Sequence, residues 1–372
     1  MLRRRAHRPD RMVSTPRRVA VVALVLTTAV TLAACSDDDQ TSDGPPVSPA
    51  PAVSAAPNAT AGSDPSSTAE PIEVADCGGT TRVTARVERA VALDQGAAEL
   101  LVWLGLRSRI AGVVLYEDAE ARWPSTSGQM AFLQVLNDLA TAAPADAIAA
   151  VEPDLLVVAD ATAVGGDLPA RADLEALGTP LHVGTATCPG ADGTELVADA
   201  LSAWYGDVRD LGVLFDVQLR AEAVVSQVQA DIARLTGTLD PAAVARLTVW
   251  ATDGSDDLHT FGGAAMVDAL LTTAGTTNAF GDLASAGSSV TASEVADRDP
   301  DVVWLVLPTG TTDLAAAADE VLARFAADPA LSQVTAVRTG AVVVSSVHDV
   351  APSPRVVEGV TQLVEGLARA SS

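Results

Sequence analysis

Side chains with the chemistry to bind a metal ion are few in this sequence. After residue 34 there are three histidines, His182, His259 and His348, and no His-rich loop. A zinc or manganese site usually needs about three histidines plus a carboxylate that converge on one point. His182 stands inside a strand-like apolar stretch, where we expect it in the core. The sequence therefore disfavours a direct zinc or manganese receptor, and we assign no metal ligands.

The sequence also contains a candidate hydrolytic site, because Asp253, Ser255 and His259 lie within seven residues of one another. An acid, a serine and a histidine make up the catalytic set of many hydrolases. The sequence has no Gly-x-Ser-x-Gly elbow, no Gly-Lys-Ser/Thr phosphate loop and no Cys-x-x-Cys motif. Serine and aspartate are abundant, so the cluster needs no catalytic explanation. We predict that the protein is not an enzyme, and a secreted hydrolase is the less favoured alternative.

Cys35 follows a segment typical of export. Seven arginines lie in the first 18 residues, an uncharged apolar run covers 19–34, and Leu32-Ala-Ala-Cys35 resembles a bacterial lipobox. The apolar run is shorter than the roughly 20 residues that a membrane-spanning helix needs. We predict a lipoprotein signal peptide at 1–34 and lipidation of Cys35, which places the protein outside the cytoplasm, anchored to the cell membrane. A plain secretory signal with a coincidental cysteine is the alternative.

The other two cysteines, Cys77 and Cys188, lie in the exported part of the chain. An even pair in an oxidising compartment is expected to form a disulfide. Closing a loop of this length stabilises a fold by about 4–5 kcal/mol in the chain-entropy model. Two unpaired buried thiols are the alternative.

The charge of the chain excludes some partners. The net charge is −25, and because residues 1–34 hold seven Arg and one Asp, the chain from Cys35 onward carries −31. Such acidity argues against nucleic-acid binding and against an electrostatic hold on anionic lipid. The membrane contact we expect is therefore the lipid anchor alone.

The composition divides the exported chain in two. Residues 36–76 are Ser, Asp, Pro, Ala, Gly and Thr with almost no large apolar side chain. Such a stretch buries too little surface to offset its ordering entropy, so we predict a disordered spacer that, with Cys35, covers 35–76. Residues 77–372 are enough for two domains of ordinary size.

The folded part alternates strand-like and helix-like segments, which predicts an α/β fold. The expected strands lie at 89–94, 109–114, 154–159 and 180–184, with helices at 96–105 and 146–151. One pattern occurs twice, at 149–158 and at 296–305: a helix end, a Pro-Asp pair and an apolar run. Proline stops the helix, and the apolar run is typical of a strand covered on both faces. The repeat indicates two similar α/β lobes.

A long stretch without proline, 207–237, separates the two copies of this pattern. Its apolar residues form an interrupted helical stripe. We predict one long helix that joins an N-terminal lobe, 77–206, to a C-terminal lobe, 238–372. Two shorter helices broken near Gly212 are the competing interpretation.

This organisation resembles the class III solute-binding proteins of bacterial ABC importers. The sequence of 89–105 is similar to the family's first strand and helix, and Glu152-Pro-Asp154 and Asp299-Pro-Asp301 are similar to its two Pro-Asp strands. Phe261-Gly-Gly263, Ala274-Gly275, Asn278 and 336–340 resemble landmarks of its second lobe. The placement of the cysteines resembles an actinobacterial branch, some members of which are proposed to bind a deazaflavin precursor.

The resemblance implies two Rossmann-like lobes with parallel sheets and a ligand cleft between them. It implies a monomeric receptor that delivers an iron(III)–siderophore, or a similar bulky metal chelate, to a permease with its ATPase. Cobalamin, haem and a deazaflavin (F420) precursor are alternative ligands. No cofactor is expected, the iron chelate being the ligand itself.

Residues at the cleft follow from the resemblance, because loops after the strands face the ligand. We expect ligand contacts from Tyr116, Trp123, Trp250, His259, Phe261, His348 and Arg355. The Arg355 guanidinium is the strongest candidate, since it can grip a carboxylate, phosphate or catecholate with two hydrogen bonds. A role for Arg355 at the start of the last helix, and core packing for Trp250, are the alternatives.

Docking to the permease uses one acidic residue in each lobe of related receptors. In the first lobe that position, seven before the Pro-Asp proline, is Asp146, while in the second it is Ser293, followed by Glu294. The resemblance therefore implies docking through Asp146 and, with a shift of one residue, Glu294. Helix capping explains acids and serine at these positions equally well.

Overall fold

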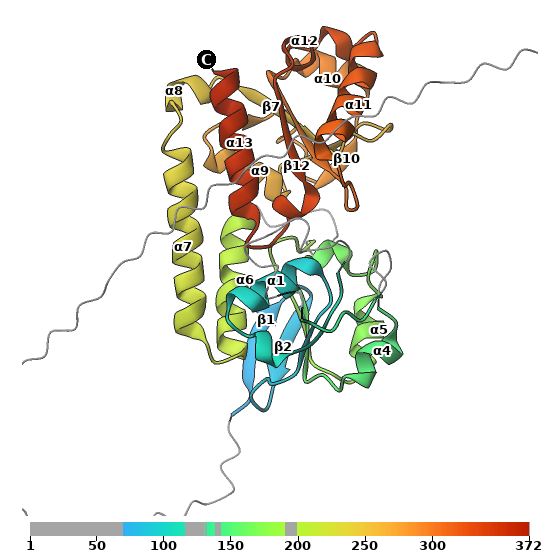
Figure 1. Ribbon diagram of the computed structural model, residues 1–372, viewed down its shortest axis with the longest axis vertical. Helices are drawn as coiled ribbons and strands as arrows, with labels where there is room; N and C mark the ends of the chain where they lie inside the picture. Colours follow the sequence, from blue (N-terminus) through green and yellow to red (C-terminus); the bar gives the residue numbers. More distant parts are fainter. Residues whose placement is uncertain (1–69, 116–129, 131, 138–142, 190–198, 372) are drawn as a thin grey trace, which may run out of the picture. The chain divides into compact units, whose positions relative to one another are not determined.

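A computed structural model of the protein describes residues 70–115, 130, 132–137, 143–189 and 199–371 (Figure 1). The chain divides into two units, Met1–Asp64 and Pro65–Ser372, and both α/β lobes belong to the second. None of the helices within the described ranges combines the length and the apolar character needed to cross a membrane.

The first described strand lies earlier in the chain than the sequence predicts. Strands β1 (Ile72–Asp76) and β2 (Gly79–Val83) pair as an antiparallel hairpin. Val74 and Val83 are buried in the main core, so the last residues of the expected spacer 35–76 belong to the fold. Composition missed this strand because its alternating pattern covers only five residues.

The N-terminal lobe is built on a parallel sheet with the strand order β4-β3-β5-β6. Its strands are β3 (Ala90–Ala92), β4 (Ile110–Val113), β5 (Leu155–Val158) and β6 (Leu181–Val183). Its described helices are α1 (Gln95–Trp103), α4 (Ala145–Ala150) and α5 (Arg171–Glu175). Each expected strand is present, shortened at each end by one or two residues.

The C-terminal lobe has a larger, mixed sheet of order β10-β8-β7-β11-β12, with β9 added beside β7. Its strands are β7 (Thr248–Thr252), β8 (His259–Phe261), β9 (Thr277–Asn278), β10 (Gly287–Ser289), β11 (Val302–Leu307) and β12 (Val342–Ser346). Its helices are α8 (Pro241–Val244), α9 (Met266–Thr273), α10 (Ala292–Arg298), α11 (Leu314–Ala327), α12 (Thr335–Thr339) and α13 (Val356–Ala370). Four strands are parallel, while β8 and β10 form an antiparallel edge that the sequence did not predict.

The repeated Pro-Asp pattern has the same geometry in both lobes. Glu152 and Asp299, which precede the prolines, both have a left-handed backbone, with φ of 46° and 40°. Asp154 then accepts hydrogen bonds from the backbone N–H groups of residues 88 and 89 at 2.7 and 3.0 Å. Asp301 accepts from the N–H of Thr248 at 2.8 Å. In each lobe the aspartate therefore fixes the start of the neighbouring central strand.

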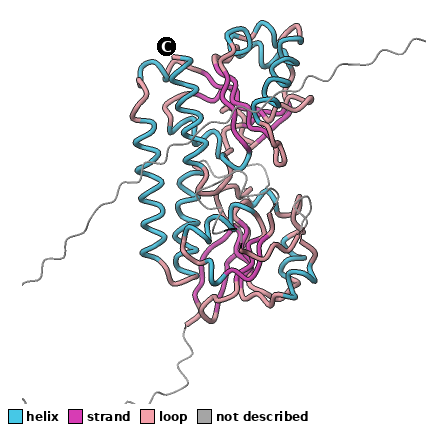
Figure 2. The backbone as a smooth tube through the Cα atoms, viewed as in Figure 1, coloured by secondary structure: helices cyan, strands magenta, loops and turns pink. Residues whose placement is uncertain are grey.

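The prediction of one helix over 207–237 is wrong. Two helices, α6 (Ala200–Leu214) and α7 (Gln218–Thr236), lie side by side (Figure 2). Asp216 has a left-handed φ of 55°, and the N–H of Val217 donates to the carbonyl of Gly212 at 2.8 Å, which ends α6. Gly212 itself serves packing, because a Cβ there would lie 2.6 Å from that of Ala221 on α7.

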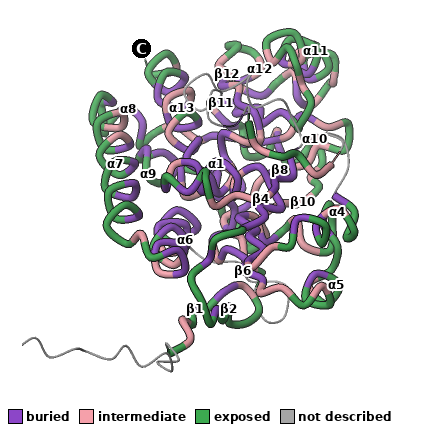
Figure 3. Tube along the Cα trace, turned by 60° about the horizontal axis from the view of Figure 1, so that its bottom comes forward, coloured by how far each residue is buried: buried purple, intermediate pink, exposed green. Residues whose placement is uncertain are grey.

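The central strand β11 is buried along its length (Figure 3), and its successive residues join two different clusters of the core. In β11, Val302 and Trp304 join a cluster that extends through α6, α7 and α13 into the N-terminal lobe. Val303 and Leu305 join a separate cluster on the other face of the sheet. This arrangement explains the uninterrupted apolar runs, since both faces of each central strand are covered.

Candidate functional site

A pocket of about 360 Å³ lies between the two lobes. The N-terminal lobe contributes Asp160, Thr162 and Thr187, which follow the carboxyl ends of β5 and β6. The C-terminal lobe contributes His259, Phe261, residues 264–267, Ala286, Gly287, Val347 and residues 350–352. Ligands of open parallel α/β sheets bind beyond the carboxyl ends of the strands, so this pocket is the candidate binding site.

The polar wall of the pocket is a hydrogen-bonded loop of the N-terminal lobe. Asp160 Oδ1 accepts from the backbone N–H of Thr162 at 3.0 Å and from its hydroxyl at 2.7 Å. The Thr187 hydroxyl also donates to Asp160 Oδ1, at 2.8 Å, and accepts from the N–H of Ala161 at 2.9 Å. The position of the Asp160 carboxylate is therefore fixed from both sides.

Two buried aspartates hold the backbone beneath this wall. Asp94, the N-cap of α1, accepts from the N–H groups of Ala159 at 2.6 Å and Asp160 at 3.2 Å. Asp207, on α6, accepts from the N–H groups of Thr185 at 2.8 Å and residue 186 at 3.1 Å. Burial raises the pKa of both carboxyl groups to about 6. Asp207 was not identified from the sequence. Its position within a predicted helix gives no indication that its carboxylate is buried.

The C-terminal wall is largely apolar. His259 and Phe261 on β8 contact each other edge to face, with ring centroids 5.6 Å apart. His259 Nδ1 lies 3.6 Å from Asp253 Oδ2. The Ser255 hydroxyl accepts the backbone N–H of His259 at 3.3 Å. That contact involves the backbone and not the imidazole, so the three residues do not form the nucleophile–base pair of a hydrolase.

Arg355 does not offer its guanidinium to the pocket, which corrects the expectation from sequence. Its side chain is 2% exposed, and Nε and Nη2 lie 2.9 and 2.8 Å from Oε1 of Glu99, whose side chain is 1% exposed. Nη1 lies 3.9 Å from Asp349. Glu99 is on α1 of the N-terminal lobe and Arg355 is the N-cap of α13 of the C-terminal lobe. The ion pair therefore joins the two lobes instead of binding a ligand.

The same joint includes a direct backbone contact. A Cβ at Gly96 would lie 2.9 Å from the carbonyl oxygen of Pro352, so the start of α1 packs closely on the segment before Arg355. Pro352 also lines the pocket. The buried joint and the pocket thus share one segment of the C-terminal lobe.

Two more predicted contacts lie elsewhere than expected. Trp250 is fully buried and stacks on Phe325 with ring centroids 5.1 Å apart, so the prediction that it contacts the ligand is wrong. His348 is half-buried, with Nε2 3.4 Å from the Thr309 hydroxyl, and it is not among the described residues that line the pocket. His259 and Phe261 do line it.

Three predicted residues, Cys35, Tyr116 and Trp123, lie outside the described part of the chain. Cys77 and Cys188 form a disulfide in the structure. It ties the turn between β1 and β2 to the loop after β6, next to Thr187 of the pocket. The disulfide therefore anchors the loop that carries part of the polar wall.

The two predicted docking acids differ in their surroundings. Asp146 is exposed in the first turn of α4, where its carboxylate accepts from the N–H of Ala147 at 3.1 Å. Glu294 forms a capping box with Thr291, accepting from its N–H at 2.7 Å and its hydroxyl at 2.8 Å. Capping therefore occupies Glu294 more fully than Asp146.

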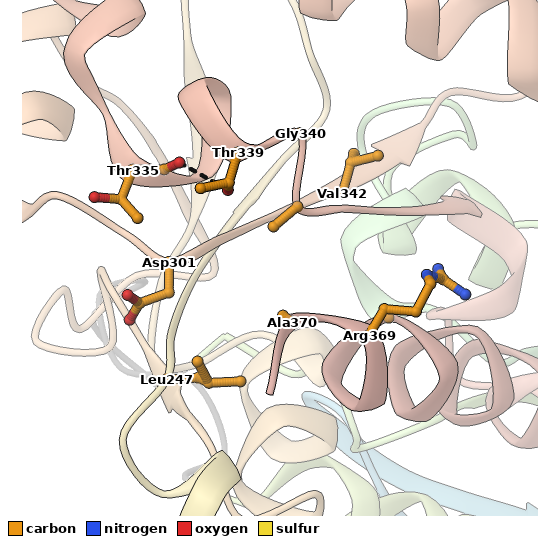
Figure 4. Close-up of a pocket in the computed structure, with 10 residues that line it drawn as sticks. Leu247, Asp301, Thr335, Thr339, Gly340, Val342, Arg369 and Ala370 are labelled. Atoms are coloured by element: carbon orange, nitrogen blue, oxygen red, sulfur yellow. Dashed lines mark hydrogen bonds between the residues drawn. The ribbon is translucent and has the colours of Figure 1, made fainter. Parts of the chain in front are cut away.

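A second pocket, of about 350 Å³, lies at the amino ends of β11 and β12 (Figure 4). It is lined by Asp301, Thr335, Thr339 and Arg369 among others. Asp301 is already bound to Thr248, and the Thr339 hydroxyl donates to the Thr335 carbonyl at 2.9 Å. These polar groups serve the fold. Within the described ranges, no group of three His, Cys, Asp or Glu residues is placed to hold a metal ion.

The family of the chain follows from comparison with known proteins. The model of the periplasmic binding protein family matches residues 91–346, so the chain belongs to this family of extracytoplasmic solute-binding proteins. No curated protein matches the chain.

Solved structures share the fold. An ABC-type Fe3+-hydroxamate transport system protein from Saccharomonospora viridis is 23% identical with a TM-score of 0.65, covering 80% of this chain and 99% of that one. A periplasmic binding protein from Veillonella parvula is 18% identical with a TM-score of 0.68, over 80% and 98% of the two chains. A periplasmic vitamin B12 binding protein from Vibrio cholerae is 16% identical with a TM-score of 0.53, over 76% and 97%.

Proposed function

We propose that the protein is the receptor of an ABC importer and holds an iron(III)–siderophore, or a similar bulky metal chelate, in the pocket between its lobes. The observation that carries the proposal is the pocket itself, which combines a mostly apolar wall with a few fixed polar groups at the carboxyl ends of the strands. This combination is typical of small-molecule sites, and about 360 Å³ falls within their usual volume of about 300–1,000 Å³.

Each wall has a distinct part in binding. The apolar C-terminal wall, with Phe261 and the residues around Met266, covers the organic face of the chelate. Asp160 and the two threonines orient it through hydrogen bonds. Cobalamin, haem and a deazaflavin precursor offer similar apolar faces and are the alternative ligands. The protein binds and releases its ligand without chemical change, so it has no catalytic role.

The receptor works beside its permease, to which it docks as a monomer. Asp146 is the better placed docking acid, because Glu294 is engaged in a capping box. A lipid on Cys35 anchors the chain to the cell membrane and raises its effective concentration near the permease. Exchange of Asp146 for alanine is then expected to slow ligand uptake by cells while ligand affinity stays unchanged.

Titration of the purified protein tests the ligand. Iron(III)–trihydroxamate and iron(III)–tricatecholate chelates, haem and cobalamin are titrated separately by calorimetry, with quenching of tryptophan fluorescence as the second signal. We expect one of them to bind with a Kd below about 10 μM, equivalent to roughly −7 kcal/mol. Failure of all of them to reach that affinity contradicts the proposal.

Two variants locate the binding site. Phe261→Ala removes an aromatic face from the pocket and is expected to weaken binding at least about tenfold, since burying an aromatic side chain contributes about 1.5–3 kcal/mol and about 1.4 kcal/mol is a factor of ten. Leu219→Ala is the matched control, because Leu219 is 91% exposed and lies outside the pocket. Equal effects of the two variants place the ligand elsewhere. Hydrolysis of any chelate that disappears in His259→Ala overturns the non-enzymatic role.

A further inference from the structure

The N-terminal wall of the pocket presents hydrogen-bond acceptors to a ligand. A hydroxyl has one hydrogen to donate, and a carboxylate only accepts. The hydroxyls of Thr162 and Thr187 both donate their hydrogen to Asp160 Oδ1, at 2.7 and 2.8 Å. The hydrogen bonds that Asp160 receives from described residues all end on Oδ1. Because the Thr187 hydroxyl also accepts the N–H of Ala161, the acceptors that the described residues leave for a ligand with N–H groups are Asp160 Oδ2, the Thr162 hydroxyl and one lone pair of the Thr187 hydroxyl.

The described residues of the opposite wall add no permanent positive charge. Among the described residues that line the pocket, His259 is the one basic side chain, and a proton on its Nδ1 would face Asp253 Oδ2 at 3.6 Å. Arg355 follows the pocket segment 350–352 in sequence, but its guanidinium is bound to the buried carboxylate of Glu99. The whole chain carries a net charge of −25, which reinforces the local preference for positive ligands.

From this arrangement we propose that Asp160 is a specificity-determining residue, which binds a protonated amine or another cationic N–H group on the chelate. The receptor therefore selects positively charged or neutral chelates over anionic ones. The inference rests on the proposed function and deepens it by naming the charge class of the ligand. An ammonium group carries three donors, which match the Asp160 and threonine acceptors. An anionic chelate would bring a second negative charge against the Asp160 carboxylate.

A charge series on one chelate tests the inference. A linear trihydroxamate that binds iron(III) and ends in a free primary amine has a net charge of +1. Its N-acetyl derivative is neutral and its N-succinyl derivative carries −1, while the iron centre is the same in all three. Calorimetric Kd values are measured for the full chain in non-ionic detergent at pH 7.5 and 150 mM salt. We expect affinity to fall from +1 to 0 to −1, with about a tenfold ratio between the ends.

Two variants assign the selectivity to Asp160. Asp160→Asn keeps an oxygen to accept the three hydrogen bonds but turns Oδ2 into a donor, so the ratio between the end members is expected to fall to threefold or less. Asp167→Asn, an exposed acid outside the pocket, makes the same change in net charge and is expected to keep the full ratio. Unchanged melting temperatures show that both variants are folded.

The outcomes separate this inference from the function on which it rests. Binding of all three chelates with equal affinity, or tightest binding of the −1 derivative, overturns the charge selectivity and leaves the receptor function standing. The same holds if Asp160→Asn keeps the wild-type ratio. Binding of none of the three refutes trihydroxamate chelates as ligands and overturns the inference with them.

Discussion

Exchange of Arg355 for methionine removes the positive half of a buried ion pair between the lobes. The Arg355 side chain is 2% exposed and that of Glu99 is 1% exposed. Methionine keeps much of the apolar stem of arginine, so the change isolates the charge better than alanine does. We expect the free energy of unfolding to fall by about 3–5 kcal/mol.

The magnitude follows from the geometry of the pair. At the 2.8 Å between Arg355 Nη2 and Glu99 Oε1, and with an effective dielectric constant of about 20, the attraction is about 6 kcal/mol. Desolvation of the two ions cancels much of that gain. The single exchange keeps the desolvation cost of Glu99 and loses the attraction, whereas the double exchange Glu99→Leu with Arg355→Met removes both and is expected to be close to neutral.

Urea unfolding at pH 7 measures these differences. Trp204, Trp250 and Trp304 are fully buried, so their fluorescence reports the loss of the core. Arg369→Met is the control. Arg369 is exposed and lies in the last turn of α13, so its exchange is expected to change the free energy of unfolding by less than about 0.5 kcal/mol. A loss below about 1 kcal/mol for Arg355→Met, or a double variant less stable than the single one, would refute the reasoning.

Three further predictions concern stability. Burial raises the pKa of Asp94 to about 6 in the folded protein, above its unfolded value, so its stabilising contribution is present at acid pH and is lost as pH rises through 6. Relative to Asp94→Asn, the free energy of unfolding of wild type is expected to fall by up to about 3 kcal/mol between pH 4 and pH 7, measured by urea titration. Gly212→Val places a side chain against Ala221 and is expected to cost about 1–3 kcal/mol, seen as a lower melting temperature; an unchanged value would contradict the close approach of α6 and α7. Reduction of Cys77–Cys188 is expected to lower the free energy of unfolding of wild type by about 4–5 kcal/mol, whereas the stability of Cys77→Ser, which lacks this bond, should not respond to reductant.

Local patterns predicted the central strands well. The proline in Glu152-Pro-Asp154 and in Asp299-Pro-Asp301 acts locally, because it ends the preceding helix whatever the rest of the fold. The apolar run that follows can then begin a strand. The two copies proved to share the left-handed residue before proline and the strand-fixing aspartate after it. The uninterrupted apolar composition of these strands likewise predicted that both of their faces are buried.

Contacts between distant residues were beyond the sequence. Arg355 and Glu99 are 256 residues apart, and nothing near either residue signals the other. An arginine before the last helix therefore suggested a ligand contact, whereas the fold uses it to join the lobes. Likewise the sequence left open a break near Gly212 but did not place it at Asp216, because this aspartate differs little from others within predicted helices. His259 and Phe261 were placed at the pocket because they follow a strand-end pattern shared with the resembling family.

The main core cluster bears on how the chain folds. It continues from Ala90 and Leu155 of one sheet through Val225 of α7 to Val302 and Val360 of the other lobe. Because this apolar surface is shared, neither lobe buries its inner face alone. Although the two lobes repeat one architectural plan, they are cooperative partners and not autonomous domains. Heat is therefore expected to melt them in a single calorimetric transition, and a chain cut after α7 should yield halves that aggregate when separated.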